Sequence, residues 1–204
     1  MRKFKYFIDF DKEEKWLKKM AKQGYQLKEK SFGYKFSLSE PADTTIKIDY
    51  RKFKNQADFI DYCTLFEDSG WKHIVGKKNS GTQYFKKIDE EKEEDIFSDS
   101  ISKAGKYKRL SKMFMETAVS FFPLFVVLLI TDTIDIGAIF NPKQLYLTPG
   151  LWEMSELSFW KAFIFETPFA LMRGISWLLL PVSSILCLFF AYKAQKLFEN
   201  GKTQ

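Results

Sequence analysis

The sequence predicts an α+β domain at the N-terminus followed by two transmembrane α-helices. Two strand-helix-strand-strand patterns follow one another in residues 1–88, and long runs without a charged residue occupy residues 117–131 and 174–192. Charge divides the chain in the same way, because residues 1–88 carry 20 Lys and Arg against 12 Asp and Glu and an acidic segment follows them. This division indicates a basic soluble part, a tether and an apolar part, and the 46% of apolar residues excludes a disordered polymer.

Each pattern opens with a strand in which apolar and polar residues alternate, over residues 3–10 and 45–53. An Ile-Asp-aromatic tripeptide, centred on Asp9 or Asp49, occupies a matching place in each strand. The two carboxylates either meet as a pair or, as the simpler alternative, cap a strand end or pair with a nearby lysine.

A helix follows each strand, with its own start signal. Asp11 stands three residues before Glu14, and Asn55 three residues before Asp58, so a cap side chain precedes an acid that favours the positive helix end. The apolar face expected to be buried comprises Trp16, Leu17, Met20 and Ala21 in the first helix and Phe59, Ile60, Cys63 and Phe66 in the second.

Each helix ends at a glycine, Gly24 or Gly70, where a left-handed backbone costs little. A hairpin then follows in each half, 25–30 with 34–38 and 71–75 with 82–88. Two such units predict one antiparallel sheet with both helices on one face.

We expect residues 89–112 to be a linker that is first acidic and then basic. A run of like charge resists burial and extends into solvent. The alternative is that the acidic run folds back onto the basic domain or onto the cluster of cations at 103–112, where it would compete with anionic lipid.

Residues 113–192 predict a two-span membrane hairpin. The first span, 113–131, holds nineteen residues and includes Glu116 near its boundary, and the second, 174–192, holds nineteen uncharged residues. At about 1.5 Å per residue each nearly covers a hydrocarbon layer of about 30 Å. A buried hairpin in a soluble protein is the alternative interpretation.

Cations flank both spans on one side, at 103–112 and 193–202. The connection between the spans, residues 132–173, contains only three cations, Lys143, Lys161 and Arg173. The positive-inside rule therefore places both termini, including the tail 193–204, in the cytoplasm and the connection outside. Residues 1–10 lack the apolar core of a signal peptide.

Several segments of the first part resemble the bacterial domain of unknown function 2812. They are RKFKYFIDF at 2–10, EEKWL at 13–17, MAKQGYQL at 20–27 and FEDSGW at 66–71. The resemblance covers roughly residues 1 to 90. It implies a bacterial cell-membrane protein, because such domains commonly precede two or more spans and are often encoded near PadR-type transcriptional regulators. It supplies no catalytic residues to carry over.

The residue inventory argues against an enzyme and against a bound cofactor. His73 is the single histidine of the sequence, and no metal-ligand spacing, Gly-rich phosphate loop or nucleophile elbow is present. Cys63 and Cys187 are too few for a disulfide scaffold, so we expect reduced thiols.

Aromatic residues on the strands are the candidate binding face, because alternation places some of them on the sheet face away from the helices. The candidates are Phe4, Tyr6, Tyr34, Phe36, Tyr50 and Tyr84, with Phe85 beside them. Our leading hypothesis is a membrane-anchored binding or sensing module that takes a protein partner or an amphiphilic small molecule. The alternative is that these rings form additional core or a dimer face.

Glu116, Glu166 and Arg173 are candidate intramembrane charges, and Glu166 and Arg173, seven residues apart, share a helix face. They support a second hypothesis, a small self-associating transport or resistance component that works as a homo-oligomer. Interfacial placement of all three charges is the simpler interpretation.

Residues 30–36 partly match the aromatic strand of RNA recognition motifs, which raises a third hypothesis, a tethered RNA-binding domain. Lys35 stands where a core valine belongs and Ser31 replaces a glycine, so nucleic acid is the least favoured partner.

Overall fold

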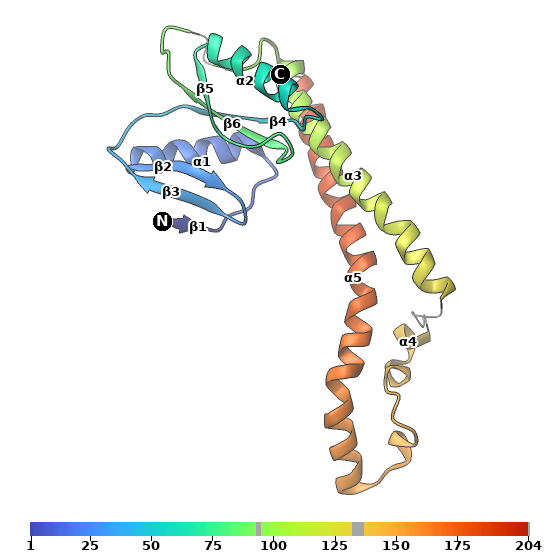
Figure 1. Cartoon of the computed structure of the whole chain (residues 1–204). Helices are drawn as coiled ribbons and strands as arrows, with labels where there is room; N and C mark the ends of the chain where they lie inside the picture. Colours follow the sequence, from blue (N-terminus) through green and yellow to red (C-terminus); the bar gives the residue numbers. More distant parts are fainter. Residues whose placement is uncertain (93–94, 132–136, 204) are drawn as a thin grey trace. The chain divides into compact units, whose positions relative to one another are not determined.

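A computed structural model describes residues 1–92, 95–131 and 137–203 (Figure 1). The chain divides into two compact units, Met1–Lys112 with Phe190–Gln204 and Met113–Phe189. Each unit is described by itself below.

The first unit contains the predicted strand-helix-strand-strand order twice. The first repeat comprises β1 (Arg2–Lys3), α1 (Phe10–Lys22), β2 (Tyr25–Lys30) and β3 (Tyr34–Leu38). The second repeat comprises β4 (Ile46–Tyr50), α2 (Gln56–Asp68), β5 (Trp71–Val75) and β6 (Thr82–Lys87). The predicted element order is therefore confirmed.

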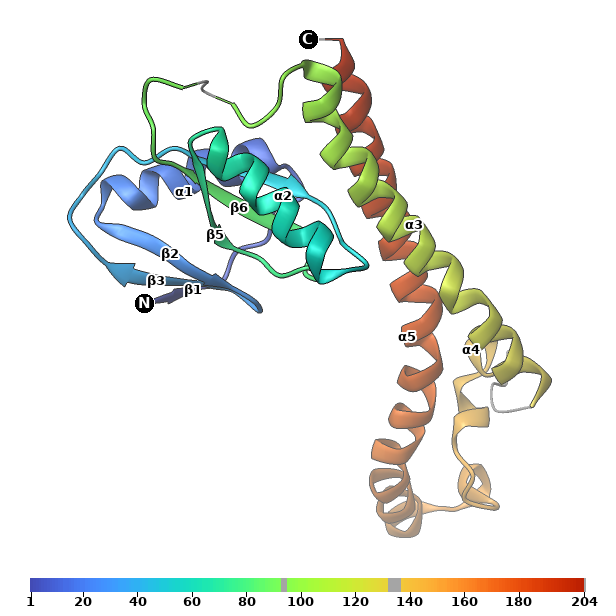
Figure 2. The same ribbon diagram turned by 45° about the horizontal axis from the view of Figure 1, so that its top comes forward.

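The prediction of one continuous sheet is wrong, because the described strands form two antiparallel sheets of three strands, ordered β1-β3-β2 and β4-β6-β5. β2 and β5 are the neighbouring edges of these sheets (Figure 2). Each of these edges carries a register shift, between Leu27 and Glu29 in β2 and between His73 and Val75 in β5. These shifts interrupt the ladders of β2 with β3 and of β5 with β6, where a bulge bends the strand locally.

From the N-cap of the helix to the strand that follows it, the two repeats correspond at a separation of 46 positions. This separation relates the helix N-caps Asp9 and Asn55 and the positive-φ glycines Gly24 and Gly70. It also relates the two register shifts. The internal duplication inferred from the sequence is thus present in the backbone, although Asp9 corresponds to Asn55 and not to Asp49.

The first strand is shorter than predicted and α1 starts earlier. β1 ends at Lys3, and Asp9 is the N-cap, its carboxylate accepting from the N–H groups of Asp11 (3.1 Å) and Lys12 (3.2 Å). A capping side chain needs an extended backbone at its own position and helical backbone directly after it. Asp9 meets both conditions, whereas the expected cap, Asp11, is already helical.

Figure 1 shows α1 beside β2 and β3, and α1 also packs on β4 of the second repeat. The core of the second repeat centres on Tyr62, Trp71 and Phe85. The predicted face of α2 is partly wrong, because Ile60 is 54% exposed while Tyr62 is buried. α2 therefore packs on this core with Tyr62, Cys63 and Phe66.

The predicted linker is interrupted by structure. α3 spans Ser100–Ile130, so residues 100–112 are helical and belong to the first unit. The end of α5 (Glu156–Lys202) belongs to the same unit, where the Ser111 hydroxyl donates to the Ala191 carbonyl at 2.9 Å. Small residues allow this close approach, since a Cβ on Gly201 would lie 3.1 Å from that of Ala104.

The second unit contains the apolar parts of α3 and α5, together with α4 (Gly137–Phe140) and two short 3-10 turns, Pro142–Leu145 and Leu151–Glu153. Both long helices have the length and composition to cross a membrane. In their most apolar windows only 6% and 12% of the residues are buried within the chain, unlike the core helices of a soluble protein. This observation favours membrane spans over a buried soluble hairpin.

Candidate functional site

The candidate site is the start of α3, where carboxylates of the α+β domain hold one face of the helix. Lys106 is fully buried, and its Nζ lies 3.1 Å from Asp11 Oδ1 and 3.3 Å from Glu14 Oε1. A buried ammonium needs opposite charge in direct contact, and α1 supplies two carboxylates from its first two turns. Burial raises the pKa of Glu14, while the ammonium groups of Lys106 and Lys47 oppose that rise.

Tyr107, the next residue of α3, contacts the N-terminus of α1. Its hydroxyl lies 3.3 Å from Asp9 Oδ1 and accepts from the Asp11 N–H at 3.3 Å, and its ring stacks on Phe10 with centroids 5.3 Å apart. Burial is the main reason that the pKa of Tyr107 is raised, so its hydroxyl stays protonated and can donate to Asp9. Tyr107 thereby ties α3 to the cap of α1.

Arg109 connects α3 to the second repeat. Its guanidinium donates to Asp49 Oδ1 and to the Tyr50 carbonyl, both at 2.5 Å. Asp49 is buried and also accepts from the Tyr62 hydroxyl of α2 at 2.8 Å. Along the same strand, the Ile48 N–H donates to Glu14 at 3.0 Å. Side chains of α1 and α3 thus satisfy the outer edge of β4, which removes an exposed strand edge.

We call Lys106, Tyr107 and Arg109, with their partners Asp9, Asp11, Glu14 and Asp49, the α3 clamp. Asp9 and Asp49 were predicted to meet as a pair or to act separately as a cap or ion-pair partner. The structure keeps them apart: Asp9 caps α1 and lies 3.6 Å from the nearby Lys12, as the second alternative expected, whereas Asp49 pairs with the distant Arg109 and not with a nearby lysine. Both nevertheless contact α3, at residues two positions apart.

Asp95, at the end of the acidic run, folds back onto the domain and onto the cations of α3. This contact agrees with the alternative interpretation of the acidic run. Asp95 lies 2.8 Å from Lys103 and 3.2 Å from Lys47. Burial opposes ionisation of Asp95, but these two ammonium groups outweigh it and hold its pKa below the usual value. Asp99 accepts from the Ser102 N–H at 2.8 Å and so starts α3.

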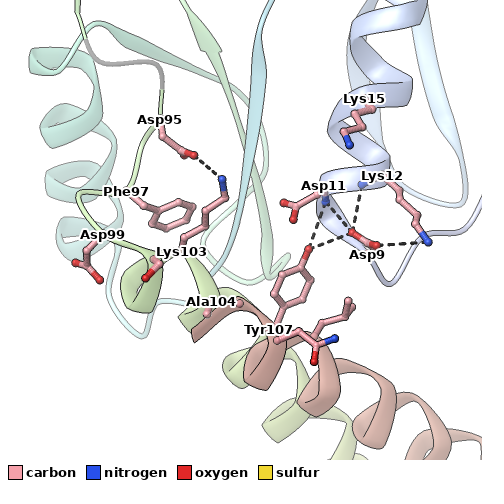
Figure 3. Close-up of a pocket in the computed structure, with 14 residues that line it drawn as sticks. Asp9, Asp11, Lys12, Lys15, Asp95, Phe97, Asp99, Lys103, Ala104 and Tyr107 are labelled. Atoms are coloured by element: carbon pink, nitrogen blue, oxygen red, sulfur yellow. Dashed lines mark hydrogen bonds and ion pairs between the residues drawn. The ribbon is translucent and has the colours of Figure 1, made fainter. Parts of the chain in front are cut away.

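A cleft of about 710 Å³ opens beside the clamp, within the size range of small-molecule pockets (Figure 3). Figure 3 shows Tyr107 reaching the start of α1 on one side and Lys103 reaching Asp95 on the other. The charged residues that line the cleft are Asp9, Asp11, Lys12, Lys15, Asp95, Asp99 and Lys103. Phe97 and Leu197 add apolar surface to it. In the described part of the chain, no group of three His, Cys, Asp or Glu residues could hold a metal ion.

Most of the predicted aromatic binding face is core, which corrects that prediction. Tyr34, Phe36, Tyr50 and Tyr84 are all at most 7% exposed. Phe4 and Tyr6, in contrast, are 74% and 64% exposed. Strand alternation identifies side chains that share a face, but it could not show that α1 covers that face through Phe10, Glu13 and Trp16.

The buried tyrosines surround a carboxyl that the sequence analysis did not single out. Glu13 of α1 accepts from the hydroxyls of Tyr34 (2.8 Å) and Tyr84 (2.7 Å), which come from different repeats. Burial raises the pKa of Glu13, and the two hydroxyl donors oppose that rise. Its place on the buried face of α1, among Leu17 and Met20, was the available signal.

The candidate charges of the apolar part occupy different settings. Within the second unit, Glu166 pairs with Arg173 and accepts from the Leu147 N–H, and Arg173 donates to the Leu145 carbonyl. The predicted common helix face is therefore used for an internal contact. Glu116 is exposed.

His73 and the RNA-like segment have structural explanations. His73 Nε2 lies 3.0 Å from Gln83 Oε1, and burial lowers the pKa of the imidazole. The 30–36 segment contains three aromatic residues that could stack on a base. Tyr34 and Phe36 are buried, so only Phe32, which is 95% exposed, is available for stacking.

A family model described as "Protein of unknown function (DUF2812)" matches residues 9–119. The chain belongs to this family. The match extends past the segment of resemblance in the sequence and into α3, so the family domain includes the α3 clamp. No curated protein and no solved structure matches the chain.

Proposed function

We propose that this DUF2812 protein is a membrane-anchored binding or sensing module whose α+β domain acts on α3 through the clamp. The observation that carries the proposal is the pairing of buried Lys106 and of Arg109 with carboxylates from both repeats. Removing one member of a buried charge pair leaves an uncompensated charge, so such a contact tends to be either fully made or broken. A contact of this kind suits a switch between two states of the helix.

The cleft is the proposed binding site, because it shares Asp9, Asp11 and Tyr107 with the clamp. A ligand that pairs with either carboxylate competes directly with Lys106 or Tyr107 of α3. The mixed charges and the apolar side chains Phe97 and Leu197 suit an amphiphilic small molecule or a segment of a protein partner. The proposed role is binding and not catalysis.

The proposed location is the bacterial cell membrane, with two spans and both termini in the cytoplasm. The flanking cations support this orientation. A self-associating transport component and an RNA-binding domain remain less supported, since the Glu166–Arg173 pair is engaged within its own unit and the RNA-like segment buries two of its rings. Modification of single cysteines introduced near each terminus, in intact cells, tests the orientation, which fails if either is labelled by an impermeant reagent.

Hydrogen–deuterium exchange on the full chain in nanodiscs tests the clamp, with Arg109→Gln as the variant. The expected result is an increase of about tenfold or more in exchange for both β4 (Ile46–Tyr50) and residues 100–112, because both depend on the same ion pair. Lys108→Gln is the matched control, since Lys108 is exposed on the same helix turn. Unchanged exchange in residues 100–112 of the Arg109 variant would reject the proposal.

A further inference from the structure

Three aromatic rings of the first repeat are exposed to solvent. Phe4, Tyr6 and Phe32 are 74%, 64% and 95% exposed. The aromatic residues within β2 and β3, in contrast, are buried or half-buried. Phe4 lies against the turn that carries Phe32, because a Cβ built on Gly33 would be 3.1 Å from the Phe4 ring. We call residues 2–6 together with 28–35 the N-terminal patch.

The N-terminal patch is strongly basic. It contains Arg2, Lys3, Lys5, Lys28, Lys30 and Lys35. Its single acid, Glu29, lies 3.5 Å from Lys35. Exposed aromatic rings among cations suit a surface that offers negative charge with an apolar layer directly beneath it.

The patch adjoins the end of the apolar run of α5. The ring of Tyr6 lies 5.7 Å from that of Phe190, two residues before the uncharged run ends at Tyr192. Tyr192 is 68% exposed, and Lys193 and Lys196 follow it. A tyrosine followed by lysines at the end of a span is typical of the headgroup region. Tyr6 is therefore held at the level where α5 leaves the hydrocarbon.

A second copy of the chain fits this patch poorly. A symmetric dimer places the same surface on both partners, so its exposed cations, Arg2, Lys5, Lys28 and Lys35, would face one another. The cytoplasmic leaflet, in contrast, carries anionic headgroups and accepts aromatic side chains at its boundary.

We propose that the N-terminal patch docks on the anionic lipid headgroups of the leaflet from which α5 emerges, with Phe32, Phe4 and Tyr6 entering the interface. This inference rests on the proposed membrane anchoring and adds a specific lipid-facing surface to it. The docked state fixes the first repeat, whose α1 holds Lys106, so the lipid composition of the leaflet acts on the α3 clamp.

Fluorescence quenching on the full chain tests the docking. Cys63 and Cys187 are replaced by alanine, Phe32→Cys is labelled with bimane, and the protein is reconstituted in nanodiscs that contain a spin-labelled lipid. Quenching is expected to be at least roughly twofold stronger in an equal mixture of phosphatidylcholine and phosphatidylglycerol than in phosphatidylcholine alone. The difference should disappear in about 0.5 M salt and after Lys28→Gln combined with Lys35→Gln, two exposed cations of the patch, because both changes weaken the electrostatic attraction.

Ile60→Cys is the matched control, since Ile60 is 54% exposed on α2, outside the patch. Equal quenching at positions 32 and 60, or the same quenching of position 32 in both lipid mixtures, overturns the docking while leaving the anchoring intact. Protection of position 32 that depends on the number of chains per disc indicates a second copy and also overturns it. Failure of the chain to enter nanodiscs rejects the membrane anchoring itself.

Discussion

In the first repeat α1 buries a carboxylate, Glu13, and presents two more to α3, whereas in the second repeat the equivalent helix α2 buries Tyr62 among aromatic rings. The position of Glu13 corresponds to Phe59 at the separation of 46 positions that relates the two N-caps. The difference shows that the caps and glycines preserve the backbone of a repeat while its side chains take on different tasks. Both repeats hold α3, but only in the first does the helix of the repeat supply carboxylates to it, and the second repeat supplies most of the aromatic core.

The neighbours of each helix explain this division. α1 packs on strands of both repeats and meets α3, so its buried face borders polar groups from three directions. α2 packs on β5 and, through Tyr62 and Phe66, on Phe85 of β6, so its buried face borders mainly aromatic rings. A carboxylate on the buried face is stable only where donors surround it, and α1 has such donors in Tyr34 and Tyr84.

The largest expected difference between the repeats lies just after the helix-ending glycines. Trp71 is 1% exposed, whereas its counterpart Tyr25 is only half-buried. Trp71→Ala should lower the free energy of unfolding by about 3 to 5 kcal/mol, and Tyr25→Ala by less than about 1.5 kcal/mol, because only the first leaves a large cavity. Chemical denaturation in detergent, followed by near-ultraviolet circular dichroism, measures both, and equal losses would contradict the assignment of the core to the second repeat.

A smaller difference is expected at the two N-caps. Asp9 accepts two backbone N–H bonds, while the side chain of Asn55 makes no cap bond to the backbone of α2. Asp9→Ala should therefore cost about 1 to 2 kcal/mol and Asn55→Ala only a few tenths of a kcal/mol. The same denaturation assay measures both losses of stability. A larger loss for the Asn55 variant would show that Asp9 is not the stronger cap.

The smallest expected effect concerns the pH dependence of stability. Because burial raises the folded-state pKa of Glu13 above its unfolded value, the stability linked to this group is full below about pH 4.5 and is lost as pH rises through the folded pKa. Glu13→Gln keeps an oxygen for the two tyrosine hydroxyls and carries no charge, so we expect it to flatten this decline and to gain up to about 1 kcal/mol at neutral pH.

Asp95→Asn is the control of opposite sign, since the pKa of Asp95 is lowered and its contribution is lost as pH falls through the folded pKa. Melting temperatures of both variants across the range from acid to mildly alkaline pH provide the measurement. A Glu13 variant that melts like the unmodified protein at every pH would show that ionisation of Glu13 does not affect the stability of the fold.

The sequence was sufficient for features that depend on a few neighbouring residues. Gly24 and Gly70 end their helices with positive φ, and the hairpins after them have the predicted strands. Periodicity found the buried Leu17, Met20 and Ala21. It misjudged Ile60, because the exposed side of α2 depends on which strands it meets.

Long-range pairing could not be predicted from local patterns. The cations at 103–112 were expected in a linker, but Lys106 and Arg109 lie against carboxylates that are 92 and 60 residues away along the chain. A lysine on a linker and a lysine in a buried ion pair have the same local sequence, and only their surroundings distinguish them. The acids on α1 were visible as cap signals, and nothing local showed that α3 would use them.

By itself the sequence determined the order of elements, the duplication, the stops at glycine and the two apolar helices, because backbone preference and hydrophobic periodicity act over short distances. Tertiary structure alone decided that two sheets form, that Tyr34, Phe36, Tyr50 and Tyr84 are buried, and that α3 is clamped to both repeats. These outcomes depend on where burial and opposite charge meet in space, and such contacts join residues far apart in the chain.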